Sequence, residues 1–141
     1  MPIQFHPKPG TILICDFNTG FQPPEMVKRR PVVVLSPQMS QRAPLCTVVA
    51  ISTESPRIAL PYHHELNIEL PSPWHVGPNW IKGDMIYSVT FNRLELIRSG
   101  KRDETGKRIY SVMQISAADL KKIRECVLCG LGLASLTRHL T

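Results

Sequence analysis

The sequence predicts a mainly β fold in which a small, strongly bent sheet or barrel is closed by one C-terminal helix. About seven short apolar segments are separated by turns rich in Gly and Pro, which is typical of small barrels. The last apolar segment has helical spacing instead, at Leu120, Ile123, Val127 and Leu131. At 141 residues the chain fits one domain, which we expect to span residues 1–141.

The composition indicates a folded, basic protein. Hydrophobic residues make up 43% and charged residues 20%, and the formal net charge is +6. This charge favours an anionic partner, such as nucleic acid or an acidic protein segment. No secretory signal and no apolar run of membrane-spanning length is visible, so we expect a cytoplasmic protein with no membrane partner. Two of the four cysteines lie in apolar segments, where a free thiol behaves as a small hydrophobe.

Residues 10–17 are the first predicted strand because they are apolar almost throughout. Residues 18–28 show no periodicity and contain Gly20 and two prolines, which indicates a long loop. That loop ends in three consecutive cations, Lys28, Arg29 and Arg30. Such a triplet is either a solvated loop end or an anion-binding site.

A short buried strand is predicted between Pro31 and Pro37, because three of the four apolar residues there are β-branched. Arg30 directly precedes this rigid segment, so its position is fixed. Its guanidinium is a planar fork of donors that stays charged, which suits a phosphate group. Because side chains alternate along a strand, Arg29 should point to the opposite face.

Residues 45–51 are the next predicted strand, and they end in a cluster of hydroxyls that includes Ser52 and Thr53. These hydroxyls are either ordinary turn residues or polar groups of a site. Residues 38–44, before this strand, are polar and predict a turn.

Residues 62–70 alternate between apolar and polar and predict a half-buried antiparallel strand. His63 and Glu65 share one face and are a conceivable metal pair. Further ligands at useful spacing are missing, however, and exposed His/Glu pairs are common, so we predict no metal site.

Residues 71–82 are predicted to be a loop whose two tryptophans, Trp74 and Trp80, either fold back onto the core or stack on bases. Residues 84–91 form the next predicted strand, and residues 93–98 and 108–113 flank a hairpin tip at residues 100–106. Residues 93–108 hold six Lys/Arg against three acids, which makes this hairpin cationic.

Ser116 begins the predicted helix with a capping box that has Asp119 in place of Glu. Residues 127–136 are apolar nearly all round, and we expect a second subunit to cover them. Cys126 and Cys129 form a lone CxxC inside the helix. A zinc site needs a second ligand pair, and a redox motif needs an exposed helix start after a strand, so neither use is favoured.

Taken together, these segments resemble the MazF/PemK family of toxin–antitoxin ribonucleases. The resemblance lies in residues 10–17, in Glu25, in Arg30-Pro-Val-Val-Val-Leu-Ser-Pro37, in residues 48–53 and 80–94, and in the helix after Ser116. It implies an SH3-like small barrel of the CcdB/MazF type with a C-terminal helix, usually as a homodimer. It also implies sequence-specific cleavage of single-stranded RNA without metal or other cofactor, leaving a 2′,3′-cyclic phosphate and a 5′-hydroxyl. Cleavage would arrest growth, and a cognate antitoxin with an acidic tail would block it.

The resemblance assigns roles to single residues. Arg30 matches the catalytic arginine of the family, Ser52 falls where the family has its catalytic threonine, and Thr53 follows directly. Glu25 matches a loop acid implicated in some members, although the loop reads Phe21-Gln-Pro-Pro-Glu25 instead of the usual Gly-Ser-Glu run. The remaining candidates are RNA-binding residues: Lys28, Arg29, Trp80, Lys82 and Arg93.

Two alternatives to an enzyme stay open. The first is a non-catalytic toxin on the same fold that acts by protein contact, as a related toxin poisons DNA gyrase. The second is a degenerate module that binds RNA or antitoxin without turnover. Arg30 and the nearby hydroxyls favour the enzyme, because a protein-binding toxin has no use for a phosphate-directed arginine.

Overall fold

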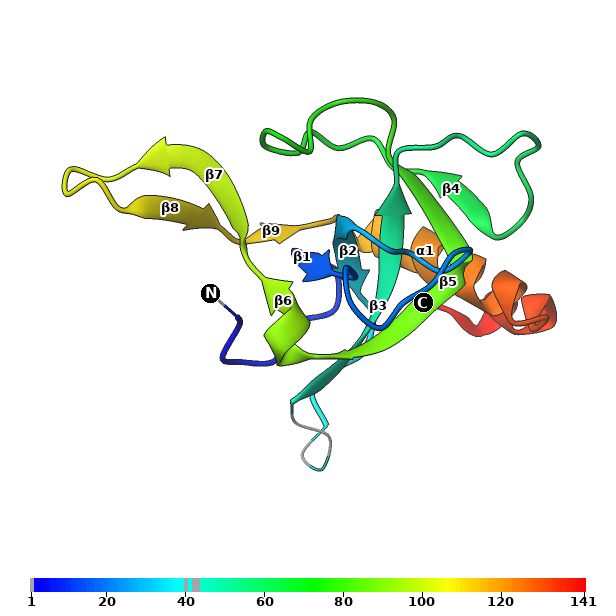
Figure 1. Ribbon diagram of the computed structural model, residues 1–141. Helices are drawn as coiled ribbons and strands as arrows, with labels where there is room; N and C mark the ends of the chain where they lie inside the picture. Colours follow the sequence, from blue (N-terminus) through cyan, green and yellow to red (C-terminus); the bar gives the residue numbers. More distant parts are fainter. Residues whose placement is uncertain (1, 40, 42–43) are drawn as a thin grey trace.

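One curled antiparallel sheet dominates the computed structural model, which describes residues 2–39, 41 and 44–141 (Figure 1). The strand order is β4-β5-β3-β2-β1-β6, and β9 also pairs with β1. These strands are β1 (Thr11–Asp16), β2 (Arg29–Val34), β3 (Leu45–Ser52), β4 (His63–Glu65), β5 (Trp80–Thr90), β6 (Leu94–Glu95) and β9 (Met113–Gln114). A separate hairpin is formed by β7 (Ile97–Arg102) and β8 (Arg108–Ser111), and it projects from the sheet in Figure 1.

The central strands β1, β2 and β3 are buried on both faces, which explains their nearly continuous apolar sequences. One face packs on helix α1 (Ala117–Gly130) and contributes Val33, Val49 and Ile51 to a core with Ile123 of that helix. The other face forms a second core that includes Val32, Val34, Val48 and Phe17. The presence of the predicted strands at 10–17, between Pro31 and Pro37, and at 45–51 is thus confirmed.

The prediction that prolines bound the second strand is wrong at its start. Strand β2 begins at Arg29, and Pro31 lies inside it opposite Ile14 of β1. The ladder to β3 is formed from Val32 onward, so the missing N–H of Pro31 falls near the strand end, where a sheet tolerates proline. The predicted turn at 38–44 includes residues 40, 42 and 43, which lie outside the described part of the chain.

Two further boundaries differ from prediction around β4 and β5. Only His63–Glu65 of the predicted strand at 62–70 forms a ladder, because its antiparallel partner β5 begins at Trp80, opposite Glu65. The alternation of apolar and polar residues over 62–70 still predicted which side chains are buried, since Leu66 and Leu70 are buried. Residues 80–82 belong to β5 and not to a loop, because Trp80 pairs with both Ser52 and Glu65.

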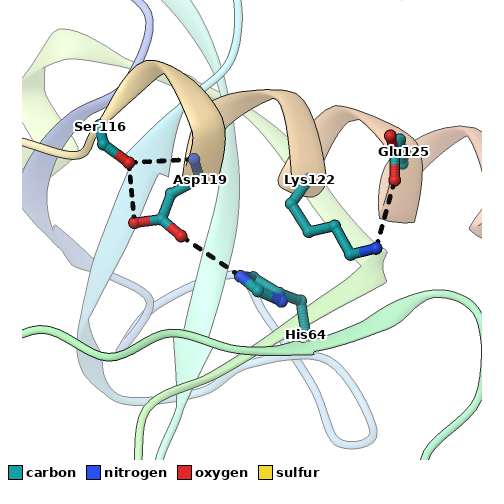
Figure 2. Close-up of polar contacts among 5 residues, drawn as sticks. All are labelled: His64, Ser116, Asp119, Lys122 and Glu125. Atoms are coloured by element: carbon teal, nitrogen blue, oxygen red, sulfur yellow. Dashed lines mark hydrogen bonds and ion pairs between the residues drawn. The ribbon is translucent and has the colours of Figure 1, made fainter.

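Helix α1 begins at the predicted cap. The Ser116 hydroxyl accepts the N–H of Asp119 and donates to its carboxylate, both at 3.1 Å (Figure 2). The other carboxylate oxygen of Asp119 lies 3.5 Å from Nε2 of His64, which joins the helix start to β4. Lys122 and Glu125 form a surface pair along the same helix at 3.5 Å.

The helix also ends earlier than the apolar pattern indicates. It stops at Gly130, and residues Ala134–His139 form a short 3-10 helix, η2. Leu131, Leu133 and Leu136 are 56%, 42% and 44% exposed. No helix within the described ranges is long and apolar enough to cross a membrane.

Gly83 allows α1 to lie directly on β5. A Cβ on this residue would overlap the backbone carbonyl of Cys126 and would lie 2.8 Å from the backbone nitrogen of Val127. Gly130 approaches the same segment, since a Cβ there would lie 2.9 Å from the backbone of Gly83 and Asp84. Glycine at position 83 therefore serves close packing and not a turn.

Candidate active site

The start of β2 and the end of β3 lie side by side and carry the predicted site residues. The β2–β3 ladder ends at the pair Val32 and Ala50, and extending its register by two residues beyond that pair would place Arg30 opposite Ser52. Ser52 in turn pairs with Trp80 of β5. Opposed residues of antiparallel strands share a face, with Cβ atoms about 4.5–5.5 Å apart. Arg30, Ser52 and Trp80 thus form one row across the sheet, which we call the Arg30 row.

Two members of the Arg30 row present buried donors without partners. Nε of Arg30 and Nε1 of Trp80 are both inaccessible to solvent, and neither has a hydrogen-bond partner among the described residues. A buried donor left unpaired destabilises a protein by about 1–3 kcal/mol. The two donors come from β2 and β5, which lie on either side of β3.

On the other side of Arg30 lies the thiol of Cys15, its register partner in β1. Burial raises the pKa of Cys15 to about 12, and the nearby Arg93 offsets this only in part. The thiol is therefore neutral at physiological pH. It supplies no negative charge that would compete for the Arg30 guanidinium.

The two predicted hydroxyl residues, Ser52 and Thr53, have different surroundings. Ser52 is 8% exposed, and its Oγ accepts the N–H of Glu54 at 3.1 Å, which leaves the hydroxyl hydrogen to donate elsewhere. Thr53 follows the last residue of β3. It lines a pocket of about 470 Å³ together with Arg30, Ile51 and Trp74.

The structure does not bring Glu25 to this pocket. Its side chain is exposed, and Oε1 accepts the N–H of Gln22 at 2.9 Å. The Glu25 N–H donates back to the Gln22 carbonyl at 2.8 Å, so Glu25 closes a turn within its own loop. The same loop is held by the Met26 N–H, which donates to the Tyr87 hydroxyl at 3.0 Å. Burial raises the pKa of Tyr87, which keeps this hydroxyl neutral.

The basic residues predicted to bind RNA lie in different parts of the sheet and its loops. Arg29 lies opposite Asp16 on the other face of β2 and forms an ion pair with Glu95 of β6. Lys28 is exposed, and Lys82 is the register partner of His63 on the far side of β5. The predicted separation of Arg29 and Arg30 onto opposite faces agrees with this register.

Arg93 holds the loop before β2. Its Nη1 donates to the carbonyl oxygens of Asp16 and Thr19 at 3.0 and 2.9 Å. Its guanidinium carbon also lies 4.8 Å from the ring centre of Phe21, at the distance of a cation–π contact. These contacts explain how the structure fixes the chain that leads to Arg30. An RNA-binding role for Arg93 stays a prediction.

The pair His63 and Glu65 does not form the start of a metal site here. Nδ1 of His63 accepts the N–H of Leu60 at 3.0 Å. Over the described residues, no group of three or more His, Cys, Asp or Glu side chains is placed to hold a metal ion.

Two residues of this region were not predicted. Asn79 is 8% exposed, lines the pocket and donates to the carbonyl of Ile68 at 3.3 Å. Arg98 lies at a neighbouring hollow that also includes Arg29. The sequence contained one signal for each, an Asn next to a strand start and a cation in the basic hairpin, but neither signal is specific.

A curled sheet with one covering helix and an arginine–hydroxyl row defines a small β-barrel protein with a site suited to an anionic group. The chain belongs to the family of PemK-like, MazF-like toxins of type II toxin–antitoxin systems, whose model matches residues 8–128. It is 31% identical over 121 residues to the uncharacterized protein YifN of Escherichia coli (strain K12), covering 70% of this chain and 78% of that protein. An uncharacterized protein of Haemophilus influenzae is 36% identical over 107 residues, covering 64% and 71%.

Solved structures confirm the predicted fold class. MazF from Deinococcus radiodurans matches with a TM-score of 0.59 and 18% identity, covering 92% of this chain and 99% of that chain. An endoribonuclease from a Mycobacterial species, solved with its cognate antitoxin, matches with a TM-score of 0.58 and 16% identity, covering 91% and 97%. At these identities the likeness concerns the fold.

Proposed function

We propose that this protein is an endoribonuclease that cuts single-stranded RNA at specific sequences through the RNA's own 2′-hydroxyl, with no metal or organic cofactor. The observation that carries the proposal is the buried Nε of Arg30, which has no hydrogen-bond partner among the described residues, in a residue that lines a pocket together with Thr53. A phosphate oxygen is the acceptor that suits a charged, forked donor best. Family membership supports a toxin role, in which cleavage arrests growth.

The reaction is an in-line displacement at phosphorus. The 2′-oxygen bonds to phosphorus, the bond from phosphorus to the 5′-oxygen breaks, and the products are a 2′,3′-cyclic phosphate and a 5′-hydroxyl. The 2′-hydroxyl loses one proton and the leaving oxygen gains one, so no oxidant, reductant or water molecule is consumed. The protein has to align the substrate and stabilise negative charge on the phosphorane.

Arg30 supplies the positive charge that stabilises the phosphorane. A guanidinium group is a permanent cation with donors only, so it suits stabilising the negative charge of the phosphorane better than donating a proton. Ser52 donates its free hydroxyl hydrogen to a non-bridging oxygen, while the Glu54 N–H holds its oxygen in place. The indole N–H of Trp80 offers a third donor from the same row. Thr53 lines the adjoining pocket and contacts the substrate there.

Glu25 acts on its loop in this proposal, although the resemblance makes it a candidate general base. Glu25→Gln keeps an acceptor for the Gln22 N–H and removes only the charge. Retained cleavage in this variant supports the loop role. A large loss of cleavage, with a changed acid limb of the pH–rate profile, would identify Glu25 as the base.

The partners follow from charge and exposed apolar surface. We infer that a cognate antitoxin with an acidic tail inhibits the protein, which fits the net charge of +6. Two structural neighbours are described as complexes, one of an endoribonuclease with its cognate antitoxin and one of MazE with MazF. We also infer a homodimer in the cytoplasm, because Leu131, Leu133 and Leu136 are exposed at the end of the chain.

The proposal is tested with purified protein and mixed-sequence RNA in EDTA. We expect cleavage to persist, with fragments that carry a 5′-hydroxyl and a 2′,3′-cyclic phosphate. An RNA with a single 2′-deoxy residue at the cut site should bind but stay intact. Activity that is lost in EDTA and restored by Mg²⁺ would contradict the mechanism. Binding without any cleavage would identify a degenerate module, and no binding would favour a toxin that acts on a protein.

A further inference from the structure

A second, more basic hollow lies close to the Arg30 pocket, on the face of Arg29. It has a volume of about 260 Å³, and its charged lining consists of Asp16, Arg29, Arg93, Glu95 and Arg98. A smaller hollow of about 170 Å³ shares Arg29 and Arg98 with this basic hollow, and it shares Trp74 with the Arg30 pocket. The three hollows adjoin one another, and we call their sequence the flanking groove.

Arg98 is the cation of this groove that is free to bind a ligand. It is exposed, and its guanidinium has no hydrogen bond or ion pair with any residue that the structure describes. By contrast, Arg93 donates to two backbone carbonyls, and Arg29 forms the ion pair with Glu95. That ion pair offsets the charge of the Glu95 carboxylate. The hollow holds three arginines against two carboxylates, Asp16 and Glu95, which leaves one net positive charge, and Arg98 is the arginine without a partner of its own among the described residues.

Trp74 forms the wall between the Arg30 pocket and the rest of the groove. It lines both hollows, and part of its ring packs against the core beneath the sheet, which fixes its position. The loop that carries it lies between β4 and β5, at the top of Figure 1. A fixed indole beside a cationic hollow is the combination that single-stranded nucleic acids bind, because bases stack on aromatic rings whatever their sequence.

We propose that Trp74 and Arg98 form a subsite for a nucleotide that flanks the cleaved one. The base of that nucleotide stacks on Trp74, and its phosphate pairs with Arg98. This inference rests on the proposed function, because it takes the scissile phosphate to lie at Arg30. The subsite predicts that affinity rises with RNA length, because an RNA too short to extend past Trp74 cannot contact Arg98.

The test measures fluorescence anisotropy with fluorescein-labelled, fully 2′-O-methylated RNAs of mixed sequence, which bind but lack the nucleophile. A trinucleotide and a nonanucleotide are compared. We expect Trp74→Ala and Arg98→Ala each to weaken nonanucleotide binding about tenfold and to leave trinucleotide binding nearly unchanged. Trp74→Phe keeps a ring and should restore most of the affinity. Arg138→Ala, an exposed arginine of η2, is the charge-matched control and should change neither.

Salt dependence separates the two roles. Arg98→Ala should make the log–log salt slope shallower by about 0.7, because one phosphate contact is lost, whereas Trp74→Ala should leave the slope unchanged. The proposed subsite would be overturned if the nonanucleotide bound equally well to the parent protein, Arg98→Ala and Trp74→Ala. If the length effect is present but unmodified RNA is not cut, the proposed catalysis fails and the subsite stands. Parent protein that binds neither RNA would overturn both.

Discussion

Replacing Gly83 with alanine tests how closely α1 is packed on β5. The new Cβ would overlap the Cys126 carbonyl and lie 2.8 Å from the Val127 nitrogen, whereas ordinary contacts of this kind are 3.4–4 Å. Both atoms belong to the helix backbone, so no rotamer change relieves the overlap. The helix must therefore move away from β5, which loosens Ile123, a core residue with 0% exposure. We expect a loss of about 3 kcal/mol, at the upper end of overpacking.

The assay is urea unfolding followed by circular dichroism. With a denaturant slope of about 2 kcal/mol per molar, the midpoint should fall by about 1.5 M. Gly106→Ala is the control, because Gly106 has φ +85° at the hairpin tip and nothing within 4 Å of an added Cβ. It should cost only the left-handed backbone penalty of about 1 kcal/mol. A Gly83→Ala midpoint at or above that of Gly106→Ala would refute the close packing.

Three further predictions concern the site and its surroundings. Ser52→Ala should lower kcat by about 10²–10³, because a hydrogen-bond donor to the developing negative charge is lost. Thr53→Ala should lower kcat by only a few-fold. The reverse order would show that Thr53, in the pocket, supplies the catalytic hydroxyl instead of Ser52. Burial raises the pKa of Cys46 to about 11, so the folded state holds this proton more tightly than the unfolded state and stability falls as pH rises from about 9 to about 11. Between these pH values the free energy of unfolding, measured with urea, should fall by about 2–3 kcal/mol less in Cys46→Ala than in the parent protein. An equal fall in both proteins would contradict the burial of the thiol. RNA affinity should fall with salt with a log–log slope of at least about −2, and a flat dependence would favour a protein partner.

Local sequence predicted the centre of the sheet well. Strands β1, β2 and β3 are runs of β-branched and aliphatic residues between turn residues, and such runs have few alternatives to burial in a sheet. The start of α1 was equally predictable, because Ser116 and Asp119 make the local hydrogen bonds of a cap.

The strand and helix ends that failed depend on contacts distant in sequence. Residues 66–70 alternate like a strand but form no ladder, because the β4–β5 ladder stops at Glu65 and Trp80; beyond it Leu66 donates its N–H to the carbonyl of Asn79 at 2.7 Å. Gly83 resembles a turn residue, and only its closeness to Cys126 explains it. The leucines after Gly130 continue the helical composition, but the chain turns there.

The site was predictable in its residue types and not in its arrangement. The position of Arg30 at a rigid strand is what makes it a candidate, and its role stays a prediction. Spacing alone could not separate Ser52 from Thr53; in the structure Ser52 ends β3 and pairs with Trp80, whereas Thr53 lines the pocket with Arg30. Nothing local indicated that Glu25 would bond to its own loop, or that Trp74 and Arg98 would line adjoining hollows.

The central claim is that Arg30 acts on the phosphate while Arg29 points away from it. Cleavage of RNA in EDTA by Arg30→Ala, Arg30→Lys and Arg29→Ala tests it most directly, with circular dichroism to confirm that each variant is folded. We expect Arg30→Ala to abolish cleavage and Arg30→Lys to lose most of it, because one ammonium cannot replace a forked contact. Arg29→Ala, which breaks an ion pair with Glu95 on the other face, should lose less than about tenfold. Cleavage that survives Arg30→Ala and disappears in Arg29→Ala would contradict the assigned register and the site built on it.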